Sequence, residues 1–97
     1  MKQDDFVIFA ELKREKFEDI LERLMKLFQQ IQFGRQGDDW IWVHFTDGKI
    51  DIDTFHSENM QVKGKLSQLK SAKEVLDALE KDWIIKKFSP PQNDLTR

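Results

Sequence analysis

One stretch constrains the fold of this chain more than any other, the segment from Asp39 to His56. Two alternating apolar runs in it flank the dipeptide Asp47-Gly48. An Asp-Gly pair between two such runs predicts a tight β-hairpin, because these residues adopt the backbone angles that a short hairpin loop requires. The remaining elements are expected to assemble around this hairpin.

The length of the hairpin loop sets which side chains share a face. A two-residue loop at Asp47-Gly48 and a four-residue loop from Thr46 to Lys49 give the same register. In that register one face is apolar and pairs Phe45 with Ile50, Val43 with Ile52, and Ile41 with Thr54. The other face pairs His44 with Asp51, Trp42 with Asp53, and Trp40 with Phe55. A three-residue loop would mix aspartates into the apolar face, so we reject it.

The hydrophobic period changes between the two elements before the hairpin. Phe6 to Leu12 has apolar residues at both odd and even positions, so both faces of a strand here would be apolar. This predicts a strand that is central in a sheet or covered on both faces. From Lys13 to Gln30 the apolar residues recur every three or four positions, which predicts an amphipathic helix lying across the sheet. Gly34 then ends either this helix or a short strand from Ile31 to Phe33.

The chain after the hairpin predicts a further strand and a second helix. Apolar and polar residues alternate from Met60 to Leu66, with lysines on the polar side, which predicts a half-exposed edge strand. Gly64 is a candidate bulge in it. Ser71 to Glu74 matches a capping box and predicts the start of a helix. Trp83 to Phe88 suits the end of that helix or a last short strand equally well.

These elements together predict an α+β two-layer sandwich, an antiparallel meander sheet with two helices packed on one face. A chain of 97 residues has room for one modest core, so we expect a single domain over residues 1–89. Pro90-Pro91 is expected to end the ordered structure and to leave residues 90–97 as a disordered tail.

Composition narrows the function classes. The chain has no cysteine, which removes disulfides, thiolate metal sites and cysteine nucleophiles. The net charge of −2 lacks the basic excess of a general nucleic-acid binder. The apolar run from Phe6 to Ala10 is too short for a signal peptide core or a membrane span, so we expect a cytoplasmic protein.

Metal binding or catalysis at the hairpin would depend on its polar residues. His44, Asp51, Asp53 and His56 supply nitrogen and oxygen ligands, but nothing in the sequence provides the supporting shell that metal sites need. The serines lie in turn or cap contexts, and no nucleophile elbow occurs. We therefore expect no enzyme activity, no metal site and no cofactor.

Protein partnership suits the same hairpin face better, because tryptophan is among the commonest residues that dominate binding energy at interfaces. The expected partner-binding residues are Trp40, Trp42, His44, Asp51, Asp53 and Phe55. The partner is expected to be a second copy in a homodimer or another protein, as for an inhibitor, immunity protein or adaptor. A small-molecule-binding regulatory domain is the alternative. Single-stranded nucleic acid fits this face less well, because Asp51 and Asp53 would repel its backbone.

Overall fold

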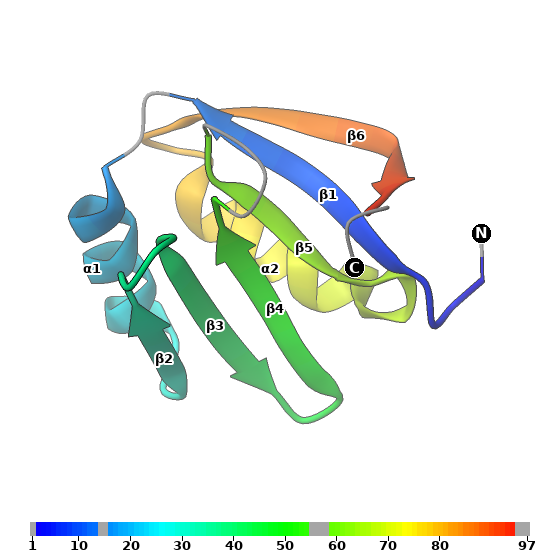
Figure 1. The fold of residues 1–97 in the computed structure, drawn as a ribbon, viewed down its shortest axis with the longest axis horizontal. Helices are drawn as coiled ribbons and strands as arrows, with labels where there is room; N and C mark the ends of the chain where they lie inside the picture. The colour runs from blue at the N-terminus through cyan, green and yellow to red at the C-terminus, as the bar shows by residue number, and fades with distance from the viewer. Residues whose placement is uncertain (1, 14–15, 55–58, 95–97) are drawn as a thin grey trace.

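The computed structural model describes residues 2–13, 16–54 and 59–94. Their elements are β1 (Phe6–Lys13), α1 (Phe17–Leu27), β2 (Ile31–Gly34), β3 (Trp40–Phe45), β4 (Gly48–Asp53), β5 (Gln61–Lys65), a 3-10 turn η1 (Leu66–Gln68), α2 (Leu69–Leu79) and β6 (Ile84–Asn93). All strands join one antiparallel sheet in the order β2-β3-β4-β5-β1-β6 (Figure 1).

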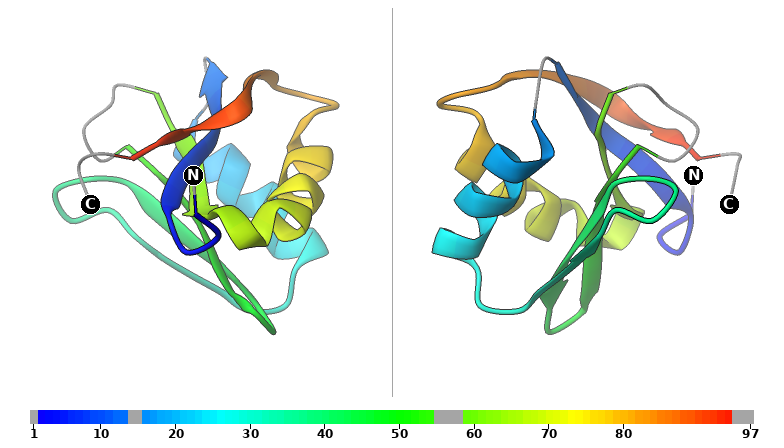
Figure 2. Two further views of the ribbon diagram at one scale, coloured as in Figure 1. Left: turned by 90° about the vertical axis from the view of Figure 1, so that its right-hand side faces the viewer. Right: turned by 60° about the vertical axis from the view of Figure 1, so that its left-hand side comes forward.

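Both helices lie on one side of this sheet and contact each other (Figure 2). The core between the two layers contains Val7, Phe9, Leu12, Ile20, Leu24, Ile41, Val43, Ile50, Ile52, Val62, Val75 and Leu79. The predicted α+β class and the placement of the helices on one face are therefore confirmed. We call the opposite side, which carries neither of the described helices, the open face.

The hairpin forms at the predicted place, but its register differs by two residues. Phe45 pairs with Gly48, so the loop is Thr46-Asp47 and Gly48 begins β4 with φ +138°. Val43 consequently faces Ile50, not Ile52. A shift of two residues keeps every side chain on its expected face, because the side-chain period of a strand is two. The division of the hairpin into an apolar and a polar face is thus correct despite the wrong register.

A bulge explains why β1 is apolar on both parities. The pairing of β1 with β5 shifts between Ile8 and Ala10, which leaves Phe9 as an extra residue. The extra residue reverses the alternation, so that Val7, Phe9, Ala10 and then Leu12 all join the core under the helices. Ile8 pairs with Lys63 on the open face and is half-buried.

β5 is a central strand, because it pairs with β4 on one side and β1 on the other. The expected edge strand with exposed lysines is therefore wrong, and Lys63 is only 1% exposed. Gly64 lies opposite Val7 without a shift in register, so the expected bulge is at Phe9 instead. A Cβ on Gly64 would come within 2.9 Å of Ile50 Cδ1, which shows that this glycine serves close packing.

The end of the chain also departs from expectation. Residues 84–93 form β6, and the end of this strand pairs with β1 through Gln92 to Ile8 and Asn93 to Val7. Pro90-Pro91 therefore does not end the ordered structure. Lys87 pairs with Ala10 and Gln92 with Ile8, so the residues between Lys87 and Gln92 bulge out of the pairing and accommodate both prolines at the sheet edge. Residues 90–93 belong to the sheet, which corrects the expected tail for that part of the chain.

The second helix begins earlier than the capping box predicts. α2 starts at Leu69, directly after η1, and Ser71 is buried inside its first turn. The serine is thus not a helix cap. Among the described residues neither α1 nor α2 has the length and apolar content that a membrane-spanning helix needs.

Candidate functional site

Three ring side chains line up along β3 on the open face. Trp40, Trp42 and His44 are spaced by two residues, so they point to the same side of the sheet, away from the helices. The two indole rings lie 4.5 Å apart between centroids, and the His44 ring stands edge-on to Trp42 at 6.4 Å. All three side chains are half-buried. We call these three residues the aromatic ladder.

Neighbouring strands hold the ladder in position. On β2, Gln32 Oε1 lies 2.7 Å from His44 Nε2, and Gly34 pairs directly with Trp40. A Cβ on Gly34 would come within 2.6 Å of the Trp40 indole, so the ring lies against the bare backbone. On β4, Lys49 Nζ lies 3.3 Å from the Trp42 ring centroid, a favourable cation–π contact.

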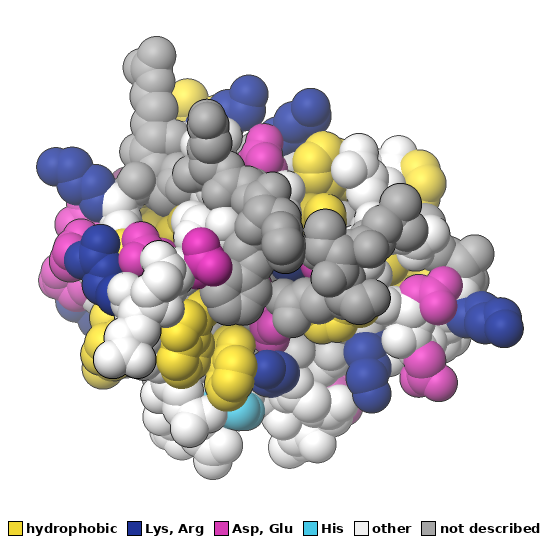
Figure 3. All heavy atoms as spheres, viewed as in Figure 1, with side chains coloured by type: hydrophobic (Ala, Val, Ile, Leu, Met, Phe, Trp, Pro, Cys, Tyr) yellow, Lys and Arg dark blue, Asp and Glu magenta, His cyan; other side chains and the backbone are white. Residues whose placement is uncertain are grey.

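The space-filling view of the open face shows hydrophobic side chains beside a histidine and a lysine, over the part of the sheet formed by β2, β3 and β4 (Figure 3). The ladder is therefore a surface of fixed rings, and its members are supported from both flanking strands.

The carboxylates next to the ladder are buried, which corrects the expectation of an exposed acidic face. Lys63 Nζ lies 2.9 Å from Asp53 Oδ1 and 3.6 Å from Asp94 Oδ2. Lys49 Nζ lies 3.6 Å from Asp51 Oδ1. Asp51, Asp53 and Lys63 are each at most 1% exposed and Asp94 is 8% exposed. We call these five residues the charge cluster.

Sequence reasoning missed Lys63 and Asp94. The alternation of β5 does place Lys63 on the same face as Asp51 once the strands are known to be neighbours, and the two residues are a direct pair. Before that pairing is known, a lysine in an alternating strand is typical of a solvated edge. Asp94 carried no signal, because it follows the prolines that were expected to end the ordered structure.

Phe55, a predicted partner-binding residue, and His56, considered only as a metal-ligand candidate, lie outside the described part of the chain. The contribution of Phe55 to the face is therefore still a prediction. Within residues 2–13, 16–54 and 59–94 no group of three or more metal-ligating side chains is placed to hold an ion. His44 faces Gln32, and Asp51 faces Lys49 and Lys63, so the described ligand candidates have other neighbours.

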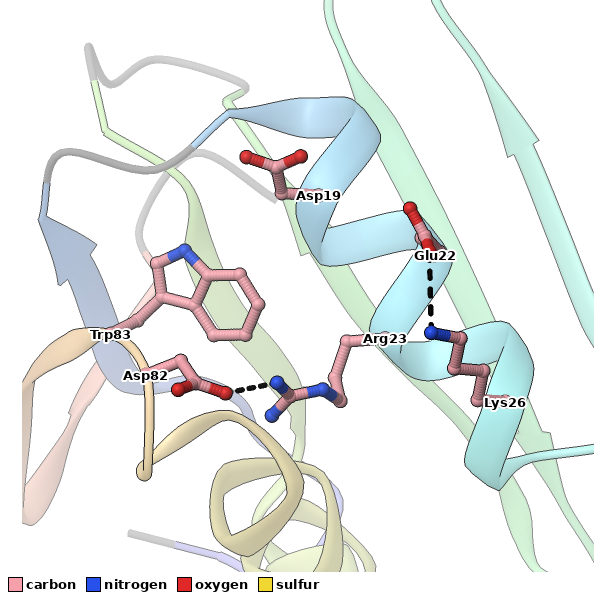
Figure 4. Close-up of a pocket in the computed structure, with 6 residues that line it drawn as sticks. All are labelled: Asp19, Glu22, Arg23, Lys26, Asp82 and Trp83. Carbon is pink, nitrogen blue, oxygen red and sulfur yellow. Dashed lines mark hydrogen bonds and ion pairs between the residues drawn. The ribbon is translucent and has the colours of Figure 1, made fainter.

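A polar pocket of about 340 Å³ lies between α1 and the turn after α2 (Figure 4). Arg23 crosses it, pairs with Asp82, donates a hydrogen bond to the Ala78 carbonyl at 3.0 Å and lies over the Trp83 ring at 5.0 Å. Lys26 pairs with Glu22 at 3.2 Å. The Arg23 guanidinium already has these partners. Its side chain therefore links α1 to the C-terminal end of α2 and the turn that follows.

An apolar groove of about 320 Å³ lies between α2 and β6. The β1 bulge turns Phe9 toward the groove. Leu69, Phe88, Lys73 and Lys87 also line the groove. Lys87 pairs with Glu80 at 3.1 Å. The groove is mainly apolar, and it lies on the helix side, away from the aromatic ladder.

A protein-family model described as a family of unknown function, DUF6756, matches residues 2–93. The chain belongs to this family. No curated protein and no solved structure matches it. The DUF6756 match includes the whole aromatic ladder and, of the charge cluster, all but Asp94. The open face is thus built almost entirely from the DUF6756 domain itself.

Proposed function

We propose that this DUF6756 chain is a small cytosolic protein-interaction domain, without catalytic activity, that binds its partner through the aromatic ladder. The observation that carries the proposal is the row of Trp40, Trp42 and His44, half-exposed on the sheet face that has no helix. Aromatic side chains in such positions supply large contact areas and dominate binding energy at protein interfaces.

The contacts around the ladder favour tight binding because they fix the rings before a partner arrives. Trp40 lies against Gly34, Trp42 lies under Lys49, and His44 faces Gln32. A side chain that is already held in its bound orientation loses little conformational entropy on association. An inhibitor, an immunity protein, an adaptor or a self-associating subunit would each gain from such a surface.

The charge cluster changes the kind of partner that we expect. Exposed carboxylates would steer a basic partner to this face, but Asp51 and Asp53 are both buried beside lysines. Long-range attraction from paired buried charges is weak, so binding should depend mainly on apolar contact and little on ionic strength. The fitting partner surface is an apolar hollow that receives the half-exposed rings of the aromatic ladder.

Affinity capture followed by direct binding measurements tests this function. A partner captured by the wild-type chain should bind Trp42→Ser roughly thirtyfold more weakly, which corresponds to about 2 kcal/mol. Ile84→Ser is the matched control, because Ile84 is 66% exposed on β6 at the far edge of the sheet. Equal affinities of wild type and Trp42→Ser for the partner would contradict the proposal.

The α2–β6 groove supports a second candidate function, binding of a small aliphatic carboxylate. Its walls include Phe9, Leu76 and Phe88, and its volume of about 320 Å³ suits a medium-length chain. Lys73 could pair with the carboxylate head at the rim. In an NMR titration decanoate should shift signals of the groove, and Lys73→Glu should weaken binding. Decanol binding as tightly as decanoate would contradict a role for the lysine.

A further inference from the structure

The strand β2 presents an open edge of the sheet. Its only neighbour among the described strands is β3. The amide of His44 donates to the Gln30 carbonyl at 2.9 Å, and the register pairs Gln32 with Trp42. Because antiparallel hydrogen bonds alternate along a strand, the backbone groups of Ile31 and Phe33 point away from β3. The edge therefore offers two N–H groups and two carbonyls in strand geometry.

The two edges of the sheet differ in how they resist pairing. β6 carries Lys86 and Lys87 as well as Pro90 and Pro91, the residue types that prevent strand addition. β2 has the sequence Ile-Gln-Phe-Gly, without a charge or a proline, and its partner β3 lies in regular register throughout. Of the two edges of the described sheet, only β2 has neither a charged residue nor a proline within the strand, although Arg35 directly follows it and pairs with Glu18 and Asp39.

Apolar side chains accompany this edge on the helix side. Phe33 is 49% exposed, and its ring lies 6.2 Å from that of Phe17 at the start of α1. Leu21 and Met25 follow Phe17 at intervals of four residues, so they continue the same side of the helix. Met25 is 56% exposed. An added strand would therefore gain apolar contacts as well as backbone hydrogen bonds.

We propose that β2 pairs antiparallel with β2 of a second copy of this chain, joining two sheets into one. The strand is self-complementary in one symmetric register, in which Gln32 faces its own copy across the two-fold axis. Ile31 then exchanges both backbone hydrogen bonds with Phe33 of the other copy, and Phe33 with Ile31. This register satisfies all four outward backbone groups and places β-branched and aromatic side chains side by side.

The symmetry gives the joined sheet a defined shape. A two-fold axis perpendicular to the sheet keeps the helices of both copies on one side. We call the junction of the two β2 strands the seam. The Leu21 and Met25 sides of the two α1 helices face each other across it. Both aromatic ladders come to lie on the opposite side. With strands about 4.8 Å apart, the two β3 strands would be separated by roughly 14 Å. The inference does not depend on the ladder having a partner of its own.

Sedimentation and light scattering from micromolar to millimolar concentration test the pairing. The wild-type chain should dimerise, and Phe33→Lys should weaken the dimer at least about tenfold, because a lysine on an edge strand opposes pairing. Ile84→Lys is the matched control on the other edge and should dimerise like the wild type. Met25→Lys is a second variant, outside the sheet, that should also weaken the dimer. Circular dichroism verifies that each variant is folded.

Amide hydrogen exchange identifies the seam directly. Exchange at Ile31 and Phe33 should slow as the protein concentration rises, while exchange at Trp42 should be slow at every concentration. A wild-type chain that stays monomeric at millimolar concentration would overturn the pairing, as would a dimer that Phe33→Lys leaves intact. A dimer lost in Trp42→Ser but kept in Phe33→Lys would place self-association on the ladder, which supports the proposed function and refutes the β2 seam.

Discussion

Lys63 Nζ lies 2.9 Å from Asp53 Oδ1, and both side chains are almost completely buried on the sheet face that carries no helix. Asp94 approaches the same ammonium group at 3.6 Å. A buried charge that loses its partner retains the full cost of leaving water. The ion pair therefore makes β4 and β5 depend on each other, since β4 supplies the aspartate and β5 the lysine.

Lys63→Met is expected to destabilise the fold by about 3–5 kcal/mol, because it leaves carboxylates buried next to an apolar side chain. Lys65→Met is the control on the same strand and face, where the side chain is exposed, and should change stability by less than about 0.5 kcal/mol. Urea unfolding of both variants measures the difference. Equal losses in the two variants would show that the cluster does not stabilise the fold.

Val43 and Trp42 are adjacent in sequence but lie on opposite faces of β3. Val43 is fully buried, so Val43→Asp places an unpaired charge under the helices and should cost several kcal/mol. Trp42→Ser removes a half-buried ring and should cost about 1–2 kcal/mol. Denaturant unfolding separates the two effects. Unfolding of Trp42→Ser as severe as that of Val43→Asp would mean that the ladder is part of the core.

The packing at Gly64 predicts an interaction with Ile50. A Cβ on Gly64 would lie 2.9 Å from Ile50 Cδ1, so Gly64→Ala should cost about 1–3 kcal/mol through overpacking. Ile50→Val removes that methyl group and should cost about 0.5–1.5 kcal/mol by itself. The double variant should lose less stability than the sum of the two single losses. Simple additivity in a double-mutant cycle would rule out this steric cause.

Glu18 predicts a small pH effect at the start of α1. A hydrogen bond from its own backbone N–H, followed by the neighbouring Arg35, lowers the pKa of Glu18 below its ordinary value of 4.5. The ionised carboxylate therefore stabilises the fold above the unfolded pKa, and this contribution is lost as the pH falls through the lower folded pKa. An NMR titration should find the lowered midpoint, and Arg35→Gln should raise it only in part. A midpoint at the ordinary value would contradict the contact.

The sequence by itself determined which side of the hairpin is core. Ile41 and Val43 alternate with Trp40 and Trp42, and this alternation survives a register shift of two residues because the side-chain period of a strand is two. The same reasoning located α1, whose apolar stripe has a period that no strand can match. Fold class and the position of the ladder therefore follow from local pattern.

Only the tertiary structure decided the order of the strands and the state of the charges. Local pattern does not distinguish a lysine at a sheet edge from a lysine on a strand between two others. Lys63 is buried because β1 pairs with β5 on the side away from β4 and because Asp94, near the end of the chain, lies next to it. Trp83 to Phe88 likewise suited two structures, and pairing of β6 with β1 selected the strand. Contacts between residues distant in sequence decide these points, because burial and pairing depend on neighbours that a periodic pattern does not contain.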